Sequence, residues 1–316
     1  KTGVGFQPDL VWLKSRGSAY EHELTDVVRG VTKAISADSV NTETTDSTGL
    51  TAFGADGFTV GADTNYADTT GDGMVAWNWK AGGAASTNTA GSVDSEVSAN
   101  TDAGFSIVSY EGDGTDTTVG HGLSKTPELI IVKARDGSSN GKWSVYSEFI
   151  GNTKRMYLNT TAAAATSGGW DDTSPTALVW SMRNYAELTG SGDDYIAYCF
   201  HSVDGFSKVG SYTGNGNADG TFVYTGFRPA YLLVKQSSAA GERWYIFDNK
   251  RDTYNYVDTR LVADDTNVET TGATQALDFV SNGFKARYNQ GAFNTSDETY
   301  IYLAFAETPF KYSNAR

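Results

Sequence analysis

The stretch PDLVWLK at residues 8–14 returns twice, as PELIIVK at 127–133 and PAYLLVK at 229–235. Each copy begins with a proline, continues with five mostly apolar residues and ends with a lysine. A second phrase follows every copy, as MVAWNW at 74–79, YIAYCF at 195–200 and YIYLAF at 300–305. The lysine of the first phrase and the last aromatic residue of the second are 65, 67 and 70 residues apart. This near-constant spacing predicts one unit that is present three times.

The middle unit indicates how each repeat is built. Apolar or alternating segments separated by turn residues predict strands at 105–110, 117–121, 128–134, 143–148, 155–159, 177–182 and 195–201. The composition agrees, because Tyr, Phe, Trp, Thr and Val favour strands while Gly, Asn and Asp favour turns. We therefore predict an all-β protein of three tandem antiparallel β-sandwich domains, jelly-roll or lectin-like, of about 100 residues each.

The repeats also suggest where the domains begin and end. We predict a first sandwich over 1–84, a Gly/Ser/Thr/Asn-rich linker over 85–103, a second sandwich over 104–202 and a third over 203–316. The linker is predicted because its small polar residues show no apolar period. The segment TDVVRGVTKAIS at 25–36 is expected to be strand and turn rather than helix, because its counterparts contain turn residues.

The first repeat lacks the strand that opens the other two. GFSIVSYEGDG at 104–114 and GFSKVGSYTGNG at 205–216 have no counterpart before Pro8. Either the chain is cut from a longer polypeptide, or another subunit donates a strand to the open sheet edge. PFKYSNA at 309–315 resembles a shortened form of the same phrase and is a further candidate for closing a sheet.

Charge and cysteine content exclude several classes of function. The chain carries 24 basic and 38 acidic residues, a net charge of −14, and such a surface repels nucleic acids and anionic membranes. The absence of an apolar run of about 18 residues argues against membrane insertion. Cys199 is the single cysteine, so no intrachain disulfide forms, and we expect it to be a small buried apolar residue.

Catalytic patterns are weak. His22, His121 and His201 do not recur at matching positions, so no metal site, cofactor or nucleophilic triad is expected, and we do not expect an enzyme. Paired carboxylates at 171–172, 193–194 and 264–265 lie in segments that read as turns, where Asp commonly bonds the backbone. Binding of Ca²⁺ by clusters such as DTTGDG at 68–73 remains open, although the spacing is not that of an EF-hand.

The loop before the last strand of each repeat is the candidate binding site. In all three loops an aromatic residue stands beside an asparagine; the candidates are Asn65, Tyr66, Asn184, Tyr185, Tyr288 and Asn289. An exposed ring stacks on a sugar face while amides bond sugar hydroxyls, so these loops predict glycan binding at one end of each sandwich. The alternative is a hairpin loop whose tyrosine only covers the end of the sandwich.

Several phrases together carry a resemblance to a known group of proteins. They are GFQPDLVWLK at 5–14, AWNWKAGG at 76–83, SANTDAGFSIVSYEG at 98–112, VGHGLSKTPELIIVK at 119–133 and TYIYLAFAETPFKYSNAR at 299–316. The chain resembles the tandem domains of uncharacterised function in tail-fibre-like structural proteins of marine bacteriophages. That resemblance implies a virion component that is assembled in the bacterial cytoplasm and displayed on the particle exterior. It carries over no functional residue.

These observations leave three functions open. The first is a non-enzymatic tail fibre or exterior spike, a homo-oligomer with a trimer favoured, that contacts other virion proteins and recognises a host surface glycan. The second is an architectural capsid-decoration or filament subunit joined by pairing of sheet edges. The third is a glycan-degrading tail enzyme that uses two carboxylates.

Overall fold

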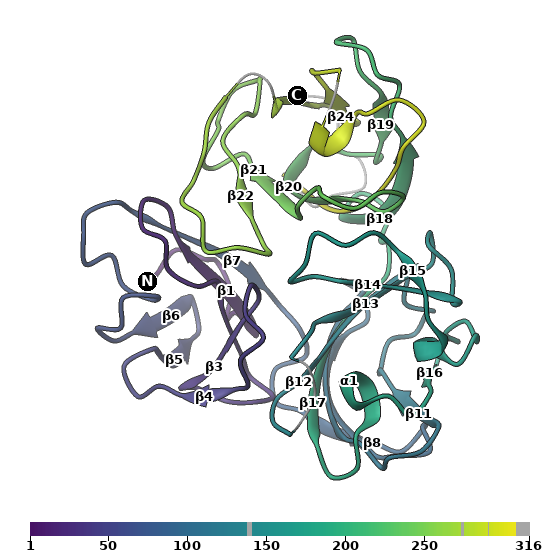
Figure 1. Ribbon diagram of the computed structural model, residues 1–316. Helices are drawn as coiled ribbons and strands as arrows, with labels where there is room; N and C mark the ends of the chain where they lie inside the picture. The colour runs from purple at the N-terminus through teal and green to yellow at the C-terminus, as the bar shows by residue number, and fades with distance from the viewer. Residues whose placement is uncertain (138–140, 273–274, 290, 308–316) are drawn as a thin grey trace. The chain divides into compact units, whose positions relative to one another are not determined.

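The protein is all-β, and its computed structural model describes residues 1–137, 141–272, 275–289 and 291–307 (Figure 1). The elements of the first half are β1 (Leu10–Ser15), β2 (Glu23–Asp26), β3 (Lys33–Ser36), β4 (Thr44–Thr45), β5 (Leu50–Gly54), β6 (Gly57–Val60), β7 (Met74–Trp79), β8 (Ser86–Asn88), β9 (Ser95–Asn100), β10 (Phe105–Glu111), β11 (Thr117–Gly120), β12 (Leu129–Ala134), β13 (Ser144–Ser147) and β14 (Lys154–Tyr157). Those of the second half are β15 (Ala165–Thr166), η1 (Gly168–Trp170), β16 (Val179–Met182), α1 (Ala186–Thr189), β17 (Asp194–Phe200), β18 (Ser207–Thr213), β19 (Phe222–Tyr224), β20 (Pro229–Gln236), β21 (Tyr245–Asp248), β22 (Leu261–Val262), β23 (Leu277–Val280), β24 (Gly283–Ala286), η3 (Gly291–Phe293) and β25 (Thr299–Ala306).

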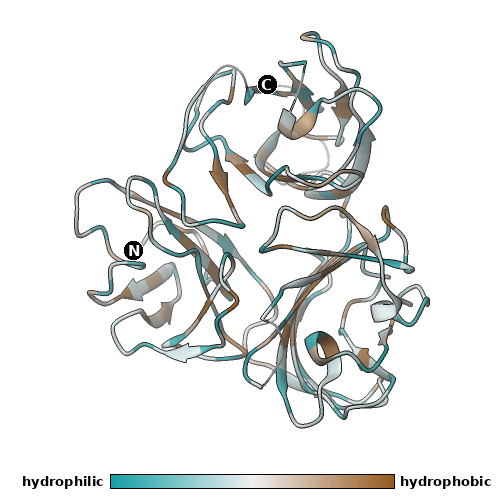
Figure 2. Cartoon of the chain, in the orientation of Figure 1, coloured by the Kyte–Doolittle hydropathy of each residue, from teal (hydrophilic) through white to brown (hydrophobic). Residues whose placement is uncertain are grey.

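The contacts divide the chain into two compact units. Unit 1 holds the described residues of 1–159, 166–200 and 265–268. Unit 2 holds 160–165, 201–264 and the described residues from 269 on. Figure 2 shows apolar residues concentrated on the sheet strands. None of the described helices has the length and apolar character that spanning a membrane requires.

Unit 1 contains two sandwiches. In the first, a five-stranded sheet of order β4-β3-β2-β1-β7 and the hairpin β5-β6 enclose a core that includes Val11, Leu50 and Phe58. In the second, an eight-stranded sheet of order β15-β14-β13-β12-β17-β10-β9-β8 and the pair β11-β16 enclose a core around Ile130 and Trp180. Every ladder is antiparallel, as the prediction of antiparallel sandwiches requires.

Unit 2 contains a sandwich of the same construction. Its five-stranded sheet has the order β18-β25-β20-β21-β22, and the second sheet has the order β19-β24-β23. Leu232 and Phe247 from the first sheet pack with Leu277 and Phe284 from the second. The segment 8–14 and its two repeats thus become β1, β12 and β20, and each is paired on both sides. The seven strands expected in the middle repeat are also present, within two residues at either end.

The segments 25–36 and 85–103 both contain strands. Residues 25–36 form the end of β2, a turn and β3, so the prediction of strand and turn is confirmed. The prediction of a linker over 85–103 is wrong, because β8 and β9 lie there and β9 pairs with β10 over its whole length. Small polar residues form these strands because the edge of β10 offers backbone partners that a local composition argument does not reveal. The segment 309–315 lies outside the described residues.

The lysine that ends each repeated phrase is wholly buried. Lys14, Lys133 and Lys235 are each 0% exposed, and desolvation lowers the pKa of each to about 8. The ammonium groups donate to backbone carbonyls, which are Ser15 O and Ser18 O for Lys14, Gly141 O and Ser39 O for Lys133, and Glu242 O and Thr161 O for Lys235. A flexible stem and three donors let lysine gather loop carbonyls at the end of the strand. The recurring lysine is therefore a structural feature of the repeat.

A buried ionic network joins the two sandwiches of unit 1. Arg29 donates from Nε to Asp26 Oδ2 at 2.6 Å, and both side chains are wholly buried. Tyr198 from β17 donates its hydroxyl to the same carboxylate oxygen at 2.9 Å. Glu43 accepts from Arg29 Nη1 at 3.3 Å and from Arg135 Nε and Nη2 at 3.0 and 3.1 Å. Residues of both sandwiches thus share one set of buried charges.

Candidate functional site

The loop before β7 holds its tyrosine inside the first sandwich. Tyr66 is 3% exposed and belongs to the core. Its hydroxyl lies 3.3 Å from Thr25 Oγ1 and donates to Glu23 Oε2 at 3.5 Å. Asn65 Oδ1 accepts the backbone N–H of Glu21 at 3.1 Å. The expectation of an exposed ring is therefore wrong at Tyr66, because the ring fills the space between the two sheets.

The loop before β17 does present a ring. Tyr185 is 37% exposed, and the guanidinium of Arg155 lies 5.3 Å from its ring centre. Asn184 instead closes the loop, since its backbone N–H donates to Asp116 Oδ1 at 3.0 Å and its side-chain amide donates to Gly114 O. Among the described residues of unit 1, no hydrogen bond or ring contact joins this loop to residues 65–66.

The loop before β25 is organised by a residue that the sequence reasoning missed. Tyr288 is half-buried and Asn289 is exposed. Asn294, by contrast, is 0% exposed and donates from Nδ2 to Tyr288 O at 2.7 Å and to Asn217 O at 2.8 Å. Its Oδ1 accepts the backbone N–H of Asn215 at 3.1 Å. Burial of an amide with several backbone partners is invisible in the sequence, where Asn294 resembles any other turn residue.

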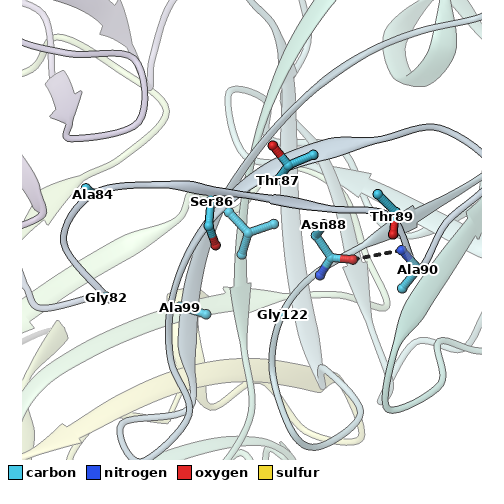
Figure 3. Close-up of a pocket in the computed structure, with 10 residues that line it drawn as sticks. Gly82, Ala84, Ser86, Thr87, Asn88, Thr89, Ala90, Ala99 and Gly122 are labelled. Carbon is cyan, nitrogen blue, oxygen red and sulfur yellow. Dashed lines mark hydrogen bonds between the residues drawn. The ribbon is translucent and has the colours of Figure 1, made fainter.

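A groove of about 510 Å³ opens beside β8 and β9 in unit 1 (Figure 3). Hydroxyl and amide side chains supply its polar groups, and small residues supply the rest; the lining is Gly82, Ala84, Ser86, Thr87, Asn88, Thr89, Ala90, Val97, Ala99 and Gly122. None of these side chains carries a charge at neutral pH. The volume falls within the range of small-molecule sites in proteins. The groove lies in the segment for which the sequence predicts a linker.

Local turn chemistry and one glycine shape this groove. Asn88 Oδ1 accepts the backbone N–H of Ala90 at 2.9 Å and turns the chain at the end of β8 (Figure 3). Across the hairpin, Ser86 pairs with Val97. Gly122 has φ +70°, and a Cβ there would lie 2.6 Å from Val97 Cγ1, so glycine permits the close approach of the two segments. The sequence signal was too weak to find this hairpin, because a single large apolar residue, Val97, marks β9.

Comparison with known proteins finds one family. Residues 1–309 match the family described as a domain of unknown function, DUF7483. The chain belongs to the DUF7483 family. No curated protein and no solved structure gives a significant match. The description of DUF7483 names no activity, so its function has to be argued from the geometry of this chain.

Two of the acidic clusters of this DUF7483 chain make turn and surface contacts. Asp171 and Asp172 accept from the guanidinium of Arg183 at 2.8 and 3.1 Å. In the 68–73 cluster, Asp68 accepts the backbone N–H groups of Gly71 and Gly73 at 2.8 and 3.1 Å. Within the described parts of the chain, no three side chains of His, Cys, Asp or Glu converge as metal ligands would. These positions therefore give no support to a catalytic pair.

Each histidine and the cysteine has a local structural role. His22 Nδ1 accepts from Trp12 Nε1 at 3.0 Å, and His121 Nδ1 accepts the backbone N–H of Leu123 at 3.2 Å. His201 Nδ1 lies 3.0 Å from Ser202 O. Cys199 is a free, buried thiol, and burial raises its pKa, so it is no nucleophile. The sequence prediction of a buried apolar role for Cys199 is confirmed.

Acidic side chains with raised pKa values lie around Ser36 in the first sandwich. Ser36 Oγ donates to Glu21 Oε2 at 2.9 Å and to Glu23 Oε1 at 3.1 Å. Burial raises the pKa of Glu23 to about 7 and that of Asp38 to about 6. Glu23 is only 4% exposed, so a polysaccharide has no access to it. The raised pKa of Glu23 therefore makes the stability of the fold depend on pH.

We expect Glu23→Gln to stabilise the protein at pH 8 more than at pH 4.5. Between pH 4.5 and about pH 7 folded Glu23 holds a proton that the unfolded chain releases, because its folded pKa of about 7 exceeds the ordinary value of 4.5. The free energy of unfolding of the parent protein therefore falls as pH rises through this window, and glutamine removes that loss. The increase in the free energy of unfolding caused by Glu23→Gln, measured by urea unfolding, should be roughly 1–3 kcal/mol larger at pH 8 than at pH 4.5.

The control for this measurement is Glu111→Gln, at an exposed end of β10. Its effect on the free energy of unfolding should not change between the two pH values. An equal effect of Glu23→Gln at pH 4.5 and pH 8 would contradict the prediction.

Proposed function

We propose that the chain is a non-enzymatic structural protein on the exterior of a bacteriophage particle, either a tail fibre or an exterior spike. In this proposal it assembles in the host cytoplasm as a homo-oligomer, with a trimer favoured, and contacts other virion proteins. It recognises a neutral glycan on the host surface. The resemblance of the repeated phrases to tail-fibre-like proteins supports the setting, and the groove beside β8 supports the ligand class.

The chemistry of the groove carries this proposal. Its lining offers the hydroxyl group of Ser86 and the amide of Asn88, which match the hydroxyl groups of a sugar, whereas the Thr87 hydroxyl donates to Glu96 Oε1 at 2.6 Å. Ala99 supplies apolar surface for the C–H face of a sugar ring, whereas Val97 is 5% exposed and belongs to the core of the second sandwich. Because no lining side chain is charged, a neutral sugar suits the groove better than an anionic one.

We expect Ser86→Trp to abolish glycan binding. Ser86 is exposed at the groove, so an indole there occupies the space of the ligand without disturbing the core. Affinity for neutral oligosaccharides of a host surface polysaccharide, measured by glycan array and then calorimetry, should fall at least about tenfold. The matched control is Ala55→Trp, an exposed position in the β5-β6 hairpin, which should bind like the parent protein.

Two further outcomes separate the alternatives. If Tyr185→Ala loses binding while Ser86→Trp keeps it, the loop before β17 is the glycan site and the groove is not. Release of reducing sugar from the host polysaccharide would support the glycan-degrading enzyme instead. An architectural subunit is the second candidate function, and the open edge of β7 is the observation that favours it.

A further inference from the structure

One sheet edge in the first sandwich is covered in the other two sandwiches of the same chain. In the second sandwich β10 pairs with β17 along seven residues, and in the third β18 pairs with β25 along seven. The strand of the first sandwich that corresponds to β17 and β25 is β7, which lies beside β1 (Figure 1). Within the described residues, β7 forms a ladder with β1 alone and is the edge of its sheet.

The backbone of β7 has groups available for another strand. Arg16 N donates to Gly73 O at 3.0 Å, immediately before β7. Hydrogen-bonded and non-hydrogen-bonded pairs alternate along an antiparallel ladder. The N–H and C=O groups of Met74, Ala76 and Asn78 therefore point away from β1. The side-chain amide of Asn78 folds back onto Ala76 O at 3.1 Å, which places a donor where a neighbouring strand would supply one.

The side chains of β7 are also less covered than their counterparts. Met74 of β7 and Tyr195 of β17 take the same position relative to the central strand of their sheets, and so do Ala76 and Ala197. Tyr195 and Ala197 are both 0% exposed. Met74 and Ala76 are only half-buried, although both pack against the core of the first sandwich. The core is thus open along the edge where the other sandwiches carry a strand.

We propose that the free edge of β7 docks one further β-strand, antiparallel to β7, with the pattern that β10 and β18 share. That pattern is G-F-S, a centre that contains valine, and then S-Y-x-G-x-G. The occupant is a segment of a separate polypeptide that carries this pattern, because β10 and β18 are already paired within their own sandwiches. The proposal goes beyond glycan recognition and does not depend on the groove.

The tyrosine of the pattern identifies where the strand would sit. Tyr110 stacks on Tyr195 with ring centres 5.0 Å apart and donates to Leu188 O at 2.7 Å. Tyr212 makes the same two contacts in the third sandwich, with Tyr300 at 5.0 Å and Phe293 O at 2.8 Å. In the first sandwich Met74 replaces the stacked tyrosine, and a thioether is a suitable neighbour for a ring.

The carbonyl partner of that tyrosine also has a counterpart. Leu188 N donates to Tyr185 O, and Tyr66 N donates to Asp63 O in a turn that likewise precedes the last strand. Tyr66 therefore occupies the place of Leu188, and its carbonyl is the acceptor that we assign to the incoming hydroxyl.

The residue opposite Ala76 selects the kind of strand. In the second sandwich Val108 lies opposite Ala197, whereas in the third Gly210 lies opposite Tyr302. A Cβ on Gly210 would lie 2.5 Å from the ring of Tyr302, so the larger neighbour requires glycine there. Because β7 carries alanine, the valine-containing strand of the β10 type fits it better than the glycine-containing strand of the β18 type.

The test uses the full chain and a labelled peptide of residues 104–114. Fluorescence anisotropy should show saturable one-to-one binding, and the peptide of residues 205–216 should bind at least about tenfold more weakly. A peptide carrying Val108→Asp is the control and should not bind. Absence of binding by the 104–114 peptide overturns the proposal.

Ala76→Pro in the protein tests the site of docking. Proline is tolerated at a sheet edge and removes one of the outward N–H groups, so this variant should fold and lose peptide affinity at least about tenfold. Hydrogen exchange of the parent protein supplies a second measurement, in which the peptide should protect the amides of Met74, Ala76 and Asn78. If the chain self-associates through this edge and the peptide does not compete, the occupant is a second copy and the proposal is overturned.

Discussion

Replacing Asp26 by alanine is expected to lower the free energy of unfolding by about 3–5 kcal/mol. Asp26 and Arg29 are both wholly buried, and the carboxylate accepts the guanidinium at 2.6 Å. Its removal takes the nearest carboxylate from the wholly buried guanidinium of Arg29 and leaves Glu43 Oε2, at 3.3 Å, as the remaining partner, which is far more costly than loss of a surface pair. Urea unfolding followed by tryptophan fluorescence measures the change.

Tyr198 adds to the expected loss. Burial, and then the charge of Asp26, raise the pKa of Tyr198, so its hydroxyl stays protonated and donates to Asp26 Oδ2. Alanine at position 26 leaves that buried donor without its acceptor as well. Because Tyr198 lies in the second sandwich and Asp26 in the first, the substitution also weakens the contact between the two sandwiches of unit 1.

A surface pair and a double variant control this prediction. Asp219→Ala removes the partner of Lys285, but the Asp219 side chain is 82% exposed, so the loss should be much smaller than that for Asp26→Ala. Asp26→Ala combined with Arg29→Met removes both charges and should recover part of the stability. A loss for Asp26→Ala no larger than that for Asp219→Ala would contradict the prediction that removing a buried ion-pair partner is costly.

Trp143→Ala is expected to lower the free energy of unfolding by about 3–5 kcal/mol. Trp143 is 0% exposed, and its ring stacks with Tyr198 at a centroid distance of 6.1 Å. Its Nε1 donates to Ser36 O at 2.9 Å, which joins the second sandwich to the first. Lys133 Nζ lies 5.8 Å from the ring centre. Truncation thus opens a cavity and removes a hydrogen bond at the same contact.

Trp143→Phe separates these two effects. Phenylalanine keeps a ring but loses the bond to Ser36 O, so about 1–2 kcal/mol should be lost. Tyr254→Ala, at a ring that is 84% exposed, is the control and should change stability by less than about 0.5 kcal/mol. Equal losses for the alanine and phenylalanine variants of Trp143 would show that the cavity contributes nothing.

The central strands were predictable because their signal is local. A short apolar run such as LIIVK at 129–133 is typical of a strand covered on both faces, and every residue of β12 is buried. The hairpin of β8 and β9 was not predictable in the same way. Strand β9 forms by pairing with the edge of β10, and β8 forms by pairing with β9. The small polar residues of this segment do not predict those partners.

The exposure of the tyrosines in the candidate loops could not be predicted from the sequence either. The tripeptide Asn-Tyr-Ala occurs at 65–67 and at 184–186, and both copies precede the last strand of a sandwich. Tyr66 is nevertheless 3% exposed, whereas Tyr185 is 37% exposed. The loops place their turns differently, so Tyr66 takes the position of Leu188 in the core. Identical residues in two such loops therefore do not occupy equivalent positions in the fold when the loops differ in length.

By itself the sequence determined that one pair of phrases occurs three times, that the fold is built from antiparallel β-sheets, and where the central and final strands run. Those features follow from apolar periodicity and turn residues, which act between neighbours in the chain. Tertiary structure alone decided that 86–100 extends a sheet, that Tyr66 is core and that Asp26, Arg29 and Tyr198 share one buried network. The physical reason is that burial and pairing depend on residues distant in sequence, as between Asp26 and Tyr198, and no local pattern records that partner.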